Sequence, residues 1–220
     1  MSPLVLLYGV GECHLDILQN VLLITGIYFL SYSKLKRMIA CGFFLLGCAV
    51  LTKYLAIIAV PFLINRKNIS FLLFFLLPFA SYFLFIESGM WESLEIFYGT
   101  MHFNDAVPRL LRFIANEGSI GYQILIPCIY SLGYVIVFLL FQDNPLKGIL
   151  YAWVWLILCL PALHPWYLLP LVFLNCFNPK RFIFYFSLIM GLYFFVLAFQ
   201  QSHHGAWVEF WWLPVYTYIG

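Results

Sequence analysis

The chain has 220 residues, of which 65% are hydrophobic and only 9% are charged, whereas about 25% of the residues in an average soluble domain are charged. This composition excludes an ordinary water-soluble domain, and it predicts an all-α, polytopic integral membrane protein that forms a single transmembrane domain over residues 1–220. A net charge of +2 gives no basic field for nucleic acid. No CxxC pair occurs among the six cysteines, so neither a zinc site nor a disulfide framework is expected.

The first residues do not resemble a signal peptide, because residues 1–10 lack a basic start and a small-residue cleavage pattern. Glu12, His14 and Asp16 follow, directly before an apolar run over residues 17–32. A carboxylate and an imidazole two residues apart could bind a metal or share a proton in acid–base chemistry. Alternatively, these acids only stabilise the start of a helix, where the helix dipole favours negative charge.

Basic residues gather in short links between the apolar runs. Residues 34–37, 66–67, 147 and 180–181 hold eight of the eleven Lys and Arg residues, and the positive-inside rule places such links in the cytoplasm. Asp143 shares that side, whereas the other eight acids and all five histidines fall in the remaining links. The partition predicts four ordinary crossings at residues 17–32, 69–86, 122–141 and 182–199.

Two further segments lie between basic links and are broken in the middle. Residues 38–64 are interrupted around Lys53, and residues 148–177 are interrupted at 161–166. Each arm of the first segment has about 11–14 residues, or ~17–21 Å of helix, which is too short to cross a bilayer. We therefore expect two broken helical hairpins that line a cavity open to the outer side. One tilted helix per segment is the alternative.

Lys53 is predicted to lie at the tip of the first hairpin. An ionisable residue at membrane depth is a functional candidate because its burial is costly. If Lys53 is functional, its natural partner is an anionic ligand such as a lipid phosphate. The alternative is that its side chain reaches the membrane surface and has no such role.

A long link at residues 87–121 is amphipathic and is expected to lie on the outer membrane face as short interfacial helices. Ala106, Leu110, Leu111 and Ile114 are spaced like one helical face, with two arginines beside them. In this link Asp105 could hold a sugar hydroxyl or a metal, and Arg109 or Arg112 could grip a phosphate bidentately. Alternatively, Asn104 or Asp105 caps the helix that begins near Ala106, and both roles can hold together.

The tip of the second hairpin carries His164, Trp166 and Tyr167 around a proline. An aromatic platform beside a titratable ring is typical of carbohydrate sites, in which tryptophan stacks on sugar. The alternative is an aromatic anchor at the membrane interface. The tail at residues 206–220 has five Trp and Tyr side chains at 207, 211, 212, 216 and 218, which is typical of an interfacial belt.

These motifs, taken in order, resemble the GT-C superfamily of glycosyltransferases. The chain looks most like the C-terminal portion of the mannosyltransferase branch that uses polyprenyl-phosphate-mannose. The resemblance covers nearly the whole chain and is carried by residues 11–16, 47–54, 103–105 with 110–112, 164–170 and 209–214.

The resemblance implies sugar transfer from a polyprenyl-phosphate donor to a glycan or glycolipid acceptor at the outer or luminal face of a bacterial inner membrane or endoplasmic reticulum. It implies an inverting displacement with a carboxylate as base. The family's acidic first loop has no counterpart here, so we expect a fragment or a half-enzyme with a second membrane subunit.

Within this expectation Asp16 is the nearest candidate for the carboxylate, and Lys53 with Arg109 or Arg112 would contact the donor phosphate. The sugar and acceptor site would be lined by His14, Asn104, Asp105, His164, Trp166 and Tyr167. No metal ligands are assigned, and a divalent metal remains compatible with the site. A non-catalytic subunit of a glycosylation complex and a lipid or sugar transporter are the alternative functions.

Overall fold

The computed structural model describes residues 15–82, 103–115, 119–177, 179–190, 193 and 199. Within these residues the chain is all-α, as predicted, and its one β-type contact is an isolated bridge. The elements are α1 (Asp16–Tyr32), α2 (Lys36–Thr52), η2 (Tyr54–Ala59), α3 (Val60–Leu63), η3 (Ile69–Phe71), α4 (Leu72–Tyr82), α6 (Val107–Arg112), α7 (Ile120–Phe141), α8 (Pro145–Cys159), η4 (Pro165–Leu168), α9 (Leu169–Leu174) and α10 (Arg181–Ile189), where η denotes a 3-10 helix.

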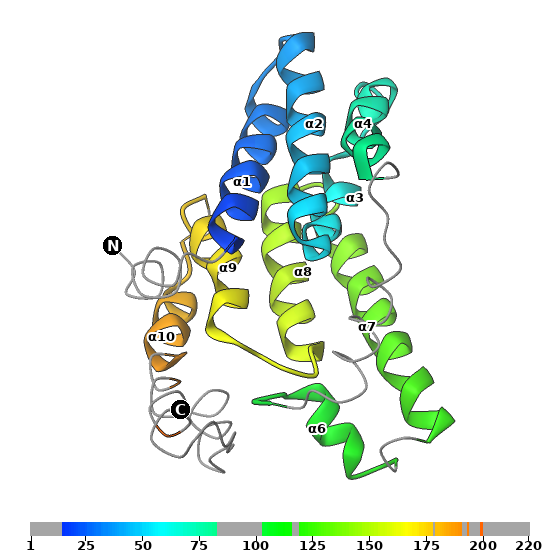
Figure 1. Ribbon diagram of the computed structural model, residues 1–220, viewed down its shortest axis with the longest axis vertical. Coiled ribbons are helices and arrows are strands. Elements are labelled where there is room, and N and C mark those ends of the chain that lie inside the picture. The colour runs from blue at the N-terminus through cyan, green and yellow to red at the C-terminus, as the bar shows by residue number, and fades with distance from the viewer. Residues whose placement is uncertain are drawn as a thin grey trace.

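Helices α1 and α2 form an antiparallel pair whose backbones approach closely (Figure 1). A Cβ atom on Gly26 would lie 3.0 Å from the Gly42 carbonyl oxygen of the neighbouring helix. Small residues permit such a close approach of two helix backbones. Leu23, Ile27 and Leu46 complete the contact, and all three are fully buried.

The other side of α2 packs against α4 through a second glycine. A Cβ atom on Gly47 would overlap the Phe75 carbonyl oxygen and would also meet the Pro78 ring. The pairs α1–α2 and α2–α4 make α2 the central helix of this half of the molecule.

The first predicted break lies where it was expected. Helix α2 ends at Thr52, Lys53 is extended with φ −157° and ψ 117°, and the 3-10 helix η2 follows. The Thr52 hydroxyl donates to the Cys48 carbonyl at 2.9 Å, and Pro61 lies in the first turn of α3, where its missing N–H is not needed. The Ile58 carbonyl in η2 accepts a hydrogen bond from the Tyr134 hydroxyl of α7 at 2.8 Å.

The second predicted break is also present. Asn144 caps the start of α8 by accepting from the Lys147 N–H at 3.2 Å, and α8 ends at Cys159. An extended stretch then leads to His164, whose φ of −97° and ψ of 153° are the conformation that a residue before proline favours. Figure 1 shows the chain returning from this stretch into α9, beside α8.

Helix α7 is the element among the described residues that is long and apolar enough to cross a membrane. It coincides with the predicted crossing at residues 122–141. Helix α1 lies at the predicted crossing 17–32, but with 17 residues it is among the shorter apolar helices and is not a candidate span by length. The crossings predicted at 69–86 and 182–199 are described only in part, as η3 with α4 and as α10. The aromatic tail at 206–220 lies outside the described residues.

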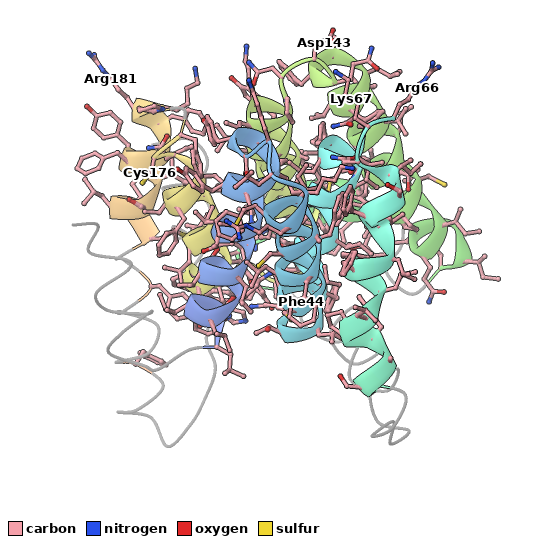
Figure 2. The ribbon with its side chains drawn as sticks, turned by 90° about the horizontal axis from the view of Figure 1, so that it is seen from above. Phe44, Arg66, Lys67, Asp143, Cys176 and Arg181 are labelled. Carbon is pink, nitrogen blue, oxygen red and sulfur yellow. The ribbon has the colours of Figure 1, made fainter. Side chains whose placement is uncertain are left out.

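Three of the links near the basic residues reach the same edge of the molecule. Figure 2 shows Arg66, Lys67, Asp143 and Arg181 along one edge of the molecule. They come from three links far apart in the sequence, and the sequence predicted a common side for all three.

The α2–α4 contact predicts that Gly47→Ala is destabilising, because the added methyl group meets a backbone carbonyl that cannot rotate away. We expect a loss of about 1–3 kcal/mol in the free energy of unfolding, measured on the purified protein in detergent. Gly121→Ala is the matched control, because its Cβ atom would meet only the Ser119 hydroxyl, at 3.8 Å. Equal stability of the two variants would contradict the packing described for Gly47.

Candidate functional site

An ion pair joins the first break to the start of α1. The Lys53 ammonium lies 2.5 Å from Oδ1 of Asp16, and the two side chains are 21% and 7% exposed. Because both groups are largely withdrawn from solvent, each needs the other to offset the cost of burying its charge. The pair brings together two predicted site residues that are 37 positions apart.

The pair bears on two alternative interpretations. Leu15 occupies the position before α1 and makes no side-chain cap, whereas Asp16 lies in the first turn of α1, where the helix dipole favours its charge, and its carboxylate also binds Lys53. The Lys53 side chain turns to Asp16 and is 21% exposed. Its backbone is fixed as well, because Nε2 of Gln19 donates to the Lys53 carbonyl at 3.2 Å.

The second break supplies the third partner of Lys53. The ammonium lies 4.1 Å from the centre of the Tyr167 ring, a distance at which the negative face of an aromatic ring attracts a cation. The Tyr167 carbonyl accepts from the indole N–H of Trp153 at 3.3 Å, which ties η4 to α8. The two hairpin tips therefore meet at one ammonium group.

His164 lies beside this cluster in a stack of rings. Its imidazole is nearly parallel to Trp166, with 4.5 Å between centroids, and to Phe103, with 5.7 Å. Nδ1 of His164 lies 2.8 Å from the Tyr193 hydroxyl, and the Tyr193 ring packs edge-on against His164. The imidazole is thus held in one orientation, which suits a ring that must present its other nitrogen in a defined direction.

Part of the predicted outer loop is attached to the second tip by backbone hydrogen bonds. Phe103 N–H donates to the Pro161 carbonyl at 3.1 Å, and Leu163 N–H donates to the Phe103 carbonyl at 2.8 Å. Asn104 follows with a φ of 49°, a left-handed conformation that asparagine tolerates better than most residues. Its side chain is fully buried, with Nδ2 at 3.8 Å from the Met190 sulfur.

Asp105 holds two arginines. Its carboxylate, which is wholly buried, lies 2.8 and 2.9 Å from two nitrogens of Arg112 and 3.3 Å from Nε of Arg109. Burial lowers the pKa of Arg112, but the hydrogen bond and charge of Asp105 outweigh it and raise that pKa. Ala106 occupies the position before α6 without a side-chain cap, so the interpretation of Asp105 as an N-cap is wrong and the ion triad replaces it.

The predicted apolar face of this loop is divided between the body of the molecule and the surface. Leu111 is buried at 6% exposure, whereas Leu110 and Ile114 are 64% and 78% exposed. Adjacent positions point about 100° apart on a helix, and packing against the body of the molecule selects Leu111. Only residues 103–115 and 119–121 of the predicted 87–121 loop are described.

The structure therefore brings most of the predicted site residues into two linked groups. Asp16, Lys53 and Tyr167 form one, and His164 joins it through Trp166 and Tyr167, with whose rings it packs. Phe103 then connects His164 to the segment that carries the Asp105 triad. His14 lies outside the described residues.

Sequence reasoning missed four members of the site: Gln19, Asn20, Phe103 and Tyr193. Gln19 and Asn20 had a recognisable signal, because they follow Asp16 at helical spacing inside an apolar run. Phe103 belongs to the motif at residues 103–105, although its ring contact with His164 was not predicted, and Tyr193 had no signal, since aromatic residues are frequent throughout this chain. Within the described part, no three His, Cys, Asp or Glu side chains lie close enough to hold a metal.

A hollow of about 350 Å³ lies near the opposite end of α1. Tyr32, Asn65 and Asp143 are among its lining residues, and about 20 Å of helix separates this end of α1 from Asp16. It is not part of the site.

Comparisons of the chain with protein-family models, curated proteins and solved structures find no match.

The geometry predicts that Asp16→Asn is destabilising because it leaves the Lys53 ammonium without its carboxylate. For a partly exposed pair we expect a loss of about 1–3 kcal/mol in the free energy of unfolding, below the range for fully buried pairs. The double variant Asp16→Asn with Lys53→Met should lose less than the sum of the single variants. Strictly additive losses in denaturant unfolding would show that the two side chains do not interact.

Proposed function

We propose that this chain is a membrane-embedded, mannosyltransferase-like glycosyltransferase, or the cavity-forming half of one, that takes a sugar from a polyprenyl-phosphate donor. The observation that carries the proposal is the convergence of Lys53, Asp16, Tyr167 and His164 in a chain with only 9% charged residues. Charged and titratable groups gathered in such an apolar chain are costly, and function is the usual reason for retaining them.

A multi-pass membrane location is supported by the surface of the molecule. Large apolar side chains are exposed along α7, α4 and α1, including Leu132, Leu139, Leu140, Leu73, Leu76 and Val21. Soluble monomers rarely expose so many. The basic edge in Figure 2 lies at the end of the helices away from the Lys53 cluster, because α1 begins at Asp16 and ends near the hollow that includes Asp143.

The chemistry of the cluster fits a lipid-linked sugar phosphate. Lys53 offers an ammonium for the donor phosphate, and the phosphate would compete with Asp16 for it. Trp166 and Tyr167 offer aromatic faces, and His164 offers a ring nitrogen for a hydroxyl. On the outer side, Arg109 and Arg112 offer guanidinium groups held in place by Asp105.

In the proposed reaction an acceptor hydroxyl attacks the anomeric carbon while the bond from that carbon to the phosphate oxygen breaks. The electron pair leaves on the phosphate, and the hydroxyl proton passes to a carboxylate base. Because Lys53 occupies the Asp16 carboxylate, we assign Asp16 to holding Lys53, and we do not assign it to taking the proton. The outer-facing ammonium would stabilise the phosphate that departs.

The proposal predicts that Lys53→Ala and His164→Ala each lower sugar transfer by at least about 100-fold while the protein still inserts and folds. Lys67→Ala is the control, because Lys67 lies on the basic edge away from the cluster. Transfer is measured with radiolabelled polyprenyl-phosphate-mannose in membranes that contain the full chain. Native rates in both site variants would overturn the assignment.

The proposed topology predicts opposite accessibility for two introduced cysteines. In a background without the six native cysteines, Lys67→Cys should react with an impermeant thiol reagent only from the cytoplasmic side. Leu110→Cys, which replaces an exposed residue of α6, should react only from the outer side. Labelling of both positions from the same side would exclude this arrangement.

A further inference from the structure

Two buried amide oxygens adjoin the Lys53–Asp16 pair. Gln19 and Asn20 are 1% and 0% exposed, and each uses its amide nitrogen within the site. Gln19 donates to the Lys53 carbonyl at 3.2 Å, and Asn20 donates to the Asp16 carbonyl at 2.6 Å. Their oxygens, Oε1 and Oδ1, are buried and accept no hydrogen bond from the described residues.

Such oxygens are a cost to the folded protein. A buried acceptor that has lost water and gained no donor destabilises the structure, whereas an apolar side chain of the same shape does not. The neighbouring buried positions of α1 are apolar, as Leu23 and Ile27 show, so packing alone does not require two amides here. A ligand that brings O–H or N–H donors would offset this cost.

The groups around the two oxygens indicate which hydrogen-bond donors a ligand would bring to them. They lie beside Lys53, the residue that the proposed function assigns to the donor phosphate, and one aromatic ring from His164 and Trp166. The part of the donor next to its phosphate is the sugar, which carries hydroxyl groups. The Lys53 side chain is 21% exposed, so this lysine connects the buried amides to the surface.

We propose that Gln19 and Asn20 form the hydroxyl-recognition subsite for the donor sugar, and that Gln19 also positions Lys53 through its carbonyl. This inference rests on the proposed function and adds the residues that select the sugar. When the donor phosphate draws Lys53 away from Asp16, the polar face of α1 opens, and two sugar hydroxyls donate to Oε1 and Oδ1.

The test uses the near-isosteric variants Gln19→Met and Asn20→Leu in the full purified chain. Two probes are compared: polyprenyl-phosphate-mannose and the same polyprenyl phosphate without the sugar. We expect Asn20→Leu to bind the sugar-free probe like the native chain, whereas Gln19→Met, which also loses the hydrogen bond to the Lys53 carbonyl, should bind it more weakly. Affinity for the mannose-bearing probe should fall by about tenfold or more, which corresponds to one lost hydrogen bond.

Asn68→Leu is the matched control. Asn68 is a buried asparagine at the basic edge whose side chain is satisfied, because it donates to the Leu63 carbonyl at 2.8 Å and accepts from the Asn65 N–H at 2.8 Å. Its replacement should lower the melting temperature and leave the affinity for both probes unchanged. The contrast separates an amide kept for a ligand from an amide kept for the fold.

A second measurement needs no variant. Binding of monodeoxy analogues of the mannose-bearing probe to the native chain should be at least about tenfold weaker for one or two of the hydroxyl positions. Equal binding of every monodeoxy analogue would overturn the inference, as would a lower melting temperature with unchanged sugar preference in both variants, which is the behaviour of amides bridged by a buried water. If the native chain binds neither probe, the proposed function fails, and this inference fails with it.

Discussion

The burial of one ammonium group is the constraint on which the arrangement of this molecule depends. Lys53 lies within an apolar chain, where a charge must be paired or its burial would cost several kcal/mol. Asp16 at the start of α1 and the Tyr167 ring after the second break meet that need together. Neither partner could reach Lys53 if α2 continued as a helix or if α8 ran directly into α9. The pairing of Lys53 therefore requires both breaks and the placement of α1 beside them.

The breaks in turn create the backbone groups that attach the outer loop. Where α8 ends, the Pro161 carbonyl and the Leu163 N–H are released from helical hydrogen bonding, and in an apolar setting such groups must find partners. Phe103 satisfies both of them. The attachment brings Asn104 and Asp105 to the body of the molecule, and Asp105 then fixes Arg109 and Arg112. The Asp105 triad thus depends on the second break as the Lys53 cluster does.

The sequence predicted the features that depend on residues close to one another along the chain. The stop after Thr52, the proline after His164 and the long apolar run of α7 each predict their own structure, and the structure agrees. Contacts between distant residues were beyond prediction: nothing in the sequence pairs Lys53 with Asp16 rather than with a ligand or solvent. Leu110 and Leu111 illustrate a different limit, since the sequence does not say which of two adjacent apolar residues packs against the body of the molecule and which stays exposed. The Asp105 capping interpretation failed for a similar reason, because two arginines within two helical turns offered the carboxylate a stronger partner than backbone N–H groups.

The charged groups of the described site are paired with one another. Of the carboxylates on the proposed outer side, the structure describes Asp16 and Asp105, and each is held by one or two cations. Both carboxylates are therefore engaged by cations in this structure. The same pairing prepares the cations for an anionic ligand, because Lys53, Arg109 and Arg112 are already oriented and need only exchange partners. In the proposed site, the amide oxygens of Gln19 and Asn20 would accept hydrogen bonds from the hydroxyl groups of the ligand. The described part of the site thus presents paired cations beside buried amide acceptors, which is the chemistry that the proposed lipid-linked sugar phosphate would require.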